Sequence, residues 1–182
     1  MKSMRAQFWS FDIIFAIVIF SVALTLLVYT WYDVNSQLSL VYGNGATIMQ
    51  LELQSLSRGI LEQGVPAYWN SVVNTSNTST WSGISAGLAA GPHTTELSES
   101  KIYTLMAMAS TSTGYQNTKQ VLGIGYDYYI AITGGGLNIT VGENPSTHGA
   151  LSTFVNSEQA FLGSTPVNVE VEVWTNQPFG VG

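Results

Sequence analysis

The stretch MRAQFWSFDIIFAIVIFSVALTLLVYTWY, residues 4–32, decides the architecture of this chain. No residue in its segment 13–32 is charged. Twenty helical residues at about 1.5 Å each span about 30 Å, the thickness of the hydrocarbon core of a bilayer. The cations Lys2 and Arg5 precede the run, and the acid Asp33 follows it. The positive-inside rule therefore predicts a membrane span with a cytoplasmic N-terminus and everything after Asp33 outside.

Composition limits what the rest of the chain does. The chain has 182 residues, and the roughly 150 that follow the apolar run are enough for one ordinary domain. Charged residues make up 9% of the chain, against about 25% in soluble globular proteins. The net charge of −6 leaves no basic patch that would bind nucleic acid. The absence of cysteine removes disulfides, thiolate metal sites and cysteine nucleophiles.

Asp12 lies just inside the upstream end of the apolar run. One interpretation is a carboxylate at headgroup level that favours the positive end of the helix. An acid at a membrane edge is costly and usually has a specific partner, so a second interpretation assigns Asp12 a partner in another chain. A cleaved secretory signal is disfavoured, because the run exceeds about 15 residues and is followed by aromatic rather than small residues.

The order of residues in this segment resembles the class III signal peptide of archaeal type IV pilin-like proteins. The resemblance covers about the first 30 residues and rests on the two cations, the Ala6-Gln7 pair, Asp12 and the unbroken apolar run. It implies a leader at 1–6, removed by prepilin peptidase between Ala6 and Gln7, and a retained helix over 7–32. Cutting there makes Asp12 the sixth mature residue. Cutting after Gln7 makes it the fifth, as is usual in the family, but leaves glutamine where the family has a small residue.

The resemblance implies a structural subunit, pilin or minor pilin-like, of a cell-surface filament. Its partners would be prepilin peptidase, other pilin-like subunits, the membrane assembly platform and the lipid bilayer, and adhesion would be one use of the filament. In a bundle of such helices, Asp12 of one copy would neutralise the new amine at Gln7 of its neighbour, a pair that a low dielectric strengthens. The alternative is an uncleaved single-pass surface protein with an adhesive or sugar-binding head. A membrane-tethered hydrolase is the least supported.

Beyond the membrane span we predict a kinked helical stalk over 33–63 and an exterior head over 64–182. Gly43-Asn44-Gly45 interrupts the helical pattern, and two glycines cost about 2 kcal/mol in a helix, which predicts a kink or local melting. Apolar residues recur at helical spacing over 46–63 and predict an amphipathic helix. Gly64-Val65-Pro66 is expected to stop it.

The head is predicted to be α+β, with an antiparallel sheet of about four strands packed on the amphipathic helix. Two short helices are expected over 97–109 and 116–122. The glycine run 134–136 predicts a hairpin between strands over 126–133 and 137–141. A weaker strand is expected over 151–162, and the clearest strand covers 167–174, where valines alternate with polar residues.

Nothing in the sequence forms a catalytic constellation. His93 and His148 lie in loops outside any metal-binding motif, so we predict no enzyme activity, no cofactor and no metal site. Glu170 and Glu172 share the wet face of one strand, which indicates a solvated surface or, less favoured, a weak cation site. Three tyrosines, Tyr126, Tyr128 and Tyr129, indicate core residues rather than a sugar-stacking surface.

Three N-glycosylation sequons begin at Asn74, Asn77 and Asn138. Such triplets arise by chance in a chain rich in serine and threonine. Their predicted location outside the cell is the one that the modification requires. All three asparagines are therefore candidate glycosylation sites.

Overall fold

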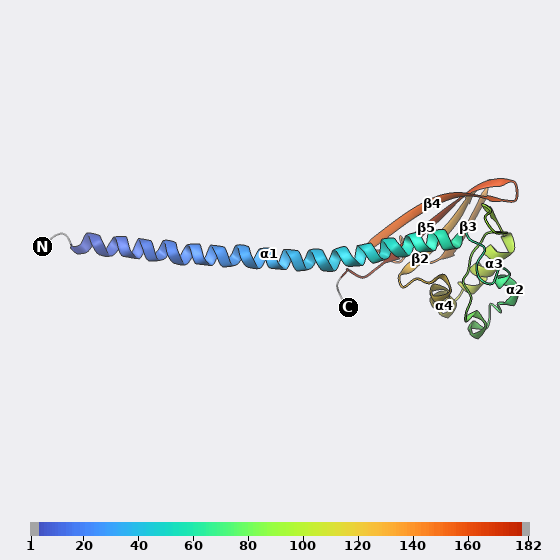
Figure 1. Ribbon diagram of the computed structural model, residues 1–182, viewed down its shortest axis with the longest axis horizontal. Coiled ribbons are helices and arrows are strands. Elements are labelled where there is room, and N and C mark those ends of the chain that lie inside the picture. The colour runs from blue at the N-terminus through green and yellow to red at the C-terminus, as the bar shows by residue number, and fades with distance from the viewer. Residues whose placement is uncertain (1–3, 180–182) are drawn as a thin grey trace. The chain divides into compact units, whose positions relative to one another are not determined.

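The computed structural model describes the backbone of residues 4–179 and the side chains of 12–34, 36 and 43–179. The chain divides into two compact units, Met1–Asn44 and Gly45–Gly182. Figure 1 shows the elements of each unit. The second unit, called the head below, includes the last part of the first helix, which the sequence placed in a separate stalk.

Helix α1 covers Met4–Ile60, which confirms a long apolar N-terminal helix. Its backbone stays helical through Gly43-Asn44-Gly45, so the predicted local melting does not occur. A Cβ at Gly45 would lie 2.5 Å from Cδ1 of Phe179, so the close approach of this ring requires a glycine there. Tyr126 also donates its hydroxyl to the Gly45 carbonyl at 3.4 Å. A kink in α1 stays a prediction.

The head contains a five-stranded sheet in the order β1-β4-β5-β2-β3. The expected four antiparallel strands are all present, as β2 (Asp127–Gly134), β3 (Leu137–Gly142), β4 (Ser152–Leu162) and β5 (Thr165–Thr175). The strand count and the purely antiparallel pairing are wrong. A fifth strand, β1 (Glu96–Leu97), pairs in parallel with the end of β4. Two residues are too few to show a period of two, so the sequence gives no signal for β1.

Four helical elements follow α1, which ends three residues before the predicted Gln63. The predicted helices 97–109 and 116–122 are confirmed as α3 (Glu99–Met108) and α4 (Ser112–Leu122). The short α2 (Trp69–Val72) and the 3-10 helix Thr78–Trp81 lie in the loop region that precedes them. Gly123 ends α4 in the left-handed conformation, with a φ of 71°, which glycine adopts without strain.

The core of the head lies between α1 and one face of the sheet. The α1 residues Met49, Leu53, Leu56 and Ile60 are buried, and so are the valines of β5, Val167, Val169, Val171 and Val173. The i, i+4, i+7 spacing on α1 and the period of two on β5 bring both sets to one interface. The head is thus the predicted mixed α+β domain. Its packing differs somewhat from the prediction, because α3 and α4 also contribute buried residues to this core, among them Ile102, Leu105 and Tyr115.

Hydrogen bonds to backbone carbonyls hold the segment that follows α1 in place. Leu88 donates its N–H to the Ile60 carbonyl at 2.8 Å. Lys101 is only 4% exposed, and its Nζ donates to the carbonyls of Gln63 and Ala89 at 2.7 and 2.8 Å. Burial lowers the pKa of this lysine. Because carbonyl groups bind the ammonium, Lys101 of α3 ties this helix to the backbone just after α1 and to the loop at Ala89.

A second set of hydrogen bonds joins α1 to the start of β2. The Glu52 carboxylate accepts the N–H groups of Gly125 and Tyr126, at 2.9 and 3.2 Å. Hydrogen bonds to a charged group are stronger than neutral ones. Glu52 therefore fixes the approach of β2 to the helix on which the sheet packs.

Candidate functional site

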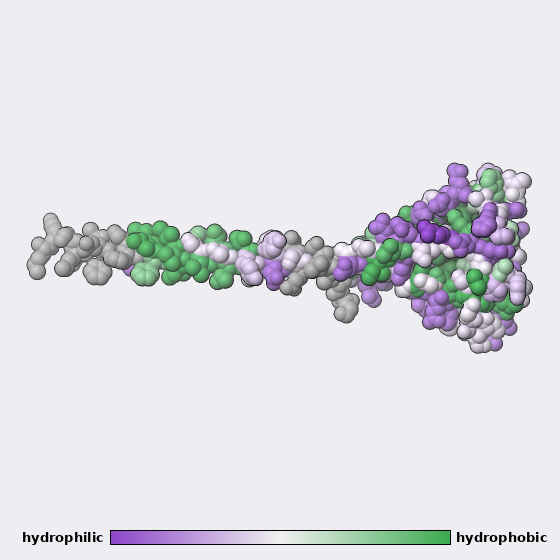
Figure 2. Space-filling model, viewed as in Figure 1, coloured by the Kyte–Doolittle hydropathy of each residue, from purple (hydrophilic) through white to green (hydrophobic). Residues whose placement is uncertain are grey.

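One helical segment, Asp12–Val34, is long and apolar enough to cross a membrane, among the residues that the structure describes. It has 23 residues, and every one of them is exposed. Figure 2 shows this segment as mainly hydrophobic, with white and pale purple residues toward its downstream end. Thr25 donates its hydroxyl to the Ser21 carbonyl at 2.8 Å, so its polar group is satisfied within the helix. Length and composition thus support a single-pass membrane segment.

Asp12 begins this segment and its side chain is exposed. It has no ion pair within 4.0 Å among the described residues. Ala6 and Gln7 lie in the helical backbone of α1, but their side chains fall outside the described residues. The predicted cleavage between them, and the pairing of Asp12 with an amine at Gln7, stay predictions.

Two of the predicted glycosylation sites lie in one tight loop. The Asn74 Oδ1 accepts the N–H of Ser76 at 3.0 Å, and the Asn77 Oδ1 accepts the N–H of Ser79 at 3.1 Å. Both are Asx turns, in which the side-chain amide oxygen, and not the nitrogen, makes the hydrogen bond to the backbone. Both side chains are exposed, so the geometry permits attachment of a sugar at either nitrogen.

The third sequon lies on a strand. Asn138 is exposed in β3, opposite Thr133 of β2. Thr140 is also exposed and shares the face of Asn138, because alternate residues of a strand point the same way. Glycosylation of all three sites stays a prediction.

The residues weighed for metal binding lie apart. The described residues contain no group of three or more His, Asp or Glu side chains that could hold a metal ion. His93 lies in a loop with a φ of 56°. His148 Nε2 lies 4.0 Å from Glu143, and both side chains are substantially exposed. The pKa of Glu172 is raised, mainly by burial of its carboxyl group and to a smaller extent by repulsion from Glu170.

The three tyrosines are distributed over the two faces of the sheet. Tyr128 is fully buried, stacks on Tyr115 with ring centroids 5.1 Å apart, and shares a 2.6 Å hydrogen bond with Thr118. Tyr126 is half-buried against the core. Tyr129 is half-buried on the opposite face from Tyr128. The core interpretation is confirmed for Tyr128, and no shared tyrosine surface forms.

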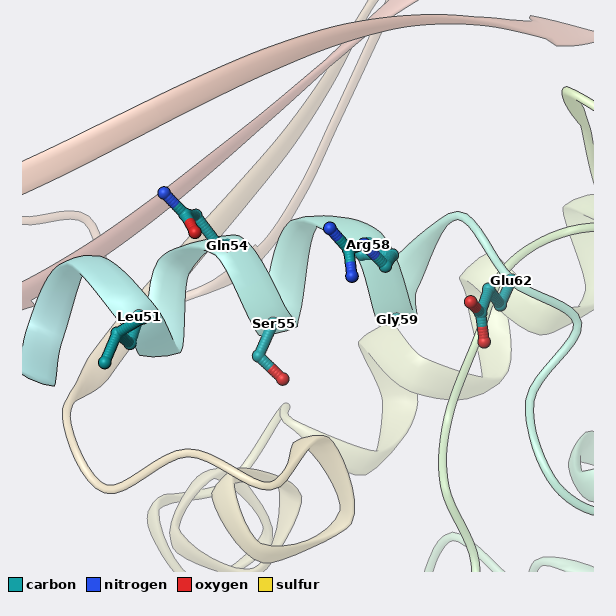
Figure 3. A pocket seen from close by; sticks show the side chains of 6 residues that line it. All are labelled: Leu51, Gln54, Ser55, Arg58, Gly59 and Glu62. Atoms are coloured by element: carbon teal, nitrogen blue, oxygen red, sulfur yellow. The ribbon is translucent and has the colours of Figure 1, made fainter.

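Sequence reasoning missed a groove between α1 and β4. It measures about 460 Å³ and is lined by Gln54, Ser57, Arg58, Leu61, Glu62, Asn156 and Glu158. Figure 3 shows a neighbouring pocket on α1 that shares Gln54, Arg58 and Glu62 with this groove. In that view Gln54 points toward the strands and Ser55 points away from them.

Two lining groups of this groove lack partners among the described residues. The Ser57 hydroxyl is buried without a hydrogen bond. Arg58 is exposed and forms no ion pair within 4.0 Å. The helical pattern of the sequence predicts that Ser57 and Arg58 lie on a helix. It does not predict that β4 lies beside that helix.

Comparison with known proteins finds no matching family model, no matching curated protein and no matching solved structure. The chemistry and geometry of the residues described above therefore carry the functional argument.

Proposed function

We propose that the chain is a structural subunit, pilin or minor pilin-like, of an archaeal type IV pilus-like filament at the cell surface. The observation that carries this proposal is the exposed apolar segment Asp12–Val34, which opens on a single acid. The head is an α+β domain with its own core, and the helical segment has no partner inside the described chain. A subunit built this way has one part for assembly and one part for display.

The exposed segment must be covered by lipid or by other helices. Tyr29, Trp31 and Tyr32 are each at least 69% exposed near its downstream end, where aromatic rings suit a membrane interface. Copies of the same helix bury apolar side chains as well as lipid tails do, so the segment can move from the bilayer into a bundle. This exchange supports assembly from a membrane pool through an assembly platform.

Asp12 supplies the specificity in this proposal. Removal of the leader 1–6 would delete both upstream cations and create an ammonium at Gln7. In a bundle, a register that separates Asp12 from the ammonium of its neighbour leaves a charge without a partner in a low dielectric, which is strongly unfavourable. The acid would therefore set the stagger between copies, while adhesion is one use of the assembled heads.

An uncleaved single-pass surface protein with an adhesive or sugar-binding head is the second candidate. The apolar segment favours it equally, because lipid alone would satisfy that segment. It gives no role to the Ala6-Gln7 pair or to the position of Asp12. Processing before the helix separates the two candidates.

Ala6→Leu tests the proposed processing. Co-expression with an archaeal prepilin peptidase is expected to shorten the wild-type chain by the six residues of the leader and to leave the Ala6→Leu variant intact, because leucine is too large for the position before the bond. Gel mobility and mass measure the result. Ala16→Leu, the same change inside the apolar segment, is the control and should be processed like the wild type. An unprocessed wild type would favour the second candidate, and a processed Ala6→Leu chain would move the bond elsewhere.

A further inference from the structure

Strand β4 forms a long free edge of the sheet. Its only outer neighbour among the described residues is β1, which pairs with Phe161 and Leu162 alone. Residues 152–160 therefore have β5 on one side and, within residues 4–179, no strand on the other. Figure 1 shows β4 along the rim of the head.

One contact shows which backbone N–H and C=O groups of β4 point away from β5. Phe161 donates its N–H outward, to the Thr95 carbonyl at 2.9 Å. Backbone direction alternates along a strand, so the N–H and C=O groups of Thr153, Val155, Ser157 and Gln159 also point outward. The residues between them use their backbone groups to pair with β5.

The β4 edge lacks most of the features by which natural proteins prevent an exposed edge strand from pairing with another chain. Natural edge strands are short, charged, bulged or interrupted by proline. β4 has 11 residues, no proline and one charged side chain, Glu158. Val155 is 52% exposed. The edge is thus a template for another strand.

We propose that two copies of the chain join their heads through β4, as antiparallel neighbours centred on Asn156. In this register Thr153 faces Gln159 of the second copy, and Val155 faces Ser157. All four are outward-pointing residues, so every free N–H along the edge meets a carbonyl of the second copy. Asn156 faces its own twin as a non-hydrogen-bonded pair. A register further toward Leu162 is blocked, because β1 already occupies that edge.

The charges of β4 suit this register. Glu158 faces Phe154 of the second copy, and the two Glu158 side chains lie four residues apart along the edge, or about 14 Å at about 3.4 Å per residue. That exceeds the screening length of about 8 Å at physiological salt. Repulsion between the two Glu158 side chains therefore does not oppose the pairing.

The groove supplies an attractive contact. Glu158 of the second copy falls diagonally across from Asn156, which lines the groove beside Arg58. Diagonal neighbours on adjacent strands lie about 7–8 Å apart, within reach of a long side chain. Arg58, which has no carboxylate partner within its own described chain, would gain one. The pairing uses only the head, so it stands or falls separately from the proposed filament.

Cysteine cross-linking of the full-length chain in membranes tests the register. The wild type has no cysteine, so each variant carries a single thiol. Asn156→Cys would place two Cα atoms about 4.5 Å apart across the pair, within the range for a disulfide. Gln159→Cys is the control, since its twin would lie six residues away, about 20 Å. Mild oxidation should give at least tenfold more dimer with Asn156→Cys, and equal or reversed yields would overturn the proposal.

A proline tests the edge hydrogen bonds. Ser157→Pro removes an outward N–H and leaves the β5 ladder intact, a position where edge strands tolerate proline. Added to Asn156→Cys, it should remove the disulfide dimer, whereas Ser157→Thr should retain it. A head that keeps its fold and cross-links undiminished with Ser157→Pro would contradict pairing through this edge. If proline disturbs the fold, the comparison of the two cysteine positions decides alone.

Discussion

Replacing Asp12 by asparagine is expected to leave membrane insertion intact and to weaken filament assembly about tenfold or more. The segment 13–32 carries no charge, so insertion does not depend on Asp12. In the proposed bundle, asparagine removes the negative partner of the ammonium at Gln7. Breaking a buried charge pair by removing one partner is strongly destabilising, because the other charge is left uncompensated.

The measurement compares filament yield with the amount of chain in the membrane fraction. Asp33→Asn is the matched control, because it removes the same charge at the other end of the apolar run. We expect this control to assemble like the wild type. Unchanged filament yield with Asp12→Asn would remove the charge pair from the account, and loss of insertion would return Asp12 to a role at the headgroups.

Alanine at Gly87 is expected to lower the free energy of unfolding of the head by about 1–3 kcal/mol or more. A Cβ at Gly87 would overlap the Glu62 carbonyl oxygen and lie 2.6 Å from the Gly64 nitrogen. Neither group can move away cheaply, since both belong to the backbone that follows α1. The Gly87 carbonyl also accepts the indole N–H of the buried Trp69 at 2.9 Å.

Gly59→Ala is the matched control and should change stability in the opposite direction. A Cβ at Gly59 meets nothing within 4 Å, and Gly59 lies in the last turn of α1. Alanine is favoured over glycine in a helix by up to about 1 kcal/mol. Denaturant titration, followed by tryptophan fluorescence, measures both variants. Equal effects of the two changes would contradict the close approach of 85–89 to the end of α1.

Much of the head could be predicted because its periodic elements are long. The alternating valines of β5 and the glycines at 134–136 place a strand and a hairpin, and the structure confirms both. The apolar spacing of Met49, Leu53 and Leu56 likewise predicts the buried face of α1. In each case the residues that carry the pattern also make the core.

Contacts between distant segments could not be predicted. Lys101 appears in the sequence as an ordinary surface cation, yet it is buried because two carbonyls from different segments converge on its Nζ. Glu52 binds backbone N–H groups more than 70 residues away. Neither contact leaves a periodic signal, since each depends on how the loops return to α1.

Part of the candidate site could likewise be predicted from the sequence, and part could not. Asp12 and the apolar segment follow from composition and order alone. The groove beside β4 and its free edge do not, because they depend on strand order. In the order β1-β4-β5-β2-β3, residues 152–160 have no outer strand beside them in the part of the chain that the structure describes.

The residue at the N-terminus of the native protein tests the central claim most directly. Mass analysis of the chain purified from its own membranes should find a chain that begins at Gln7, or at Phe8 if the bond after Gln7 is cut. Either result creates the amine that Asp12 is proposed to meet. A native chain that still begins at Met1 would contradict the account, because its leader would keep that amine away from the helix bundle.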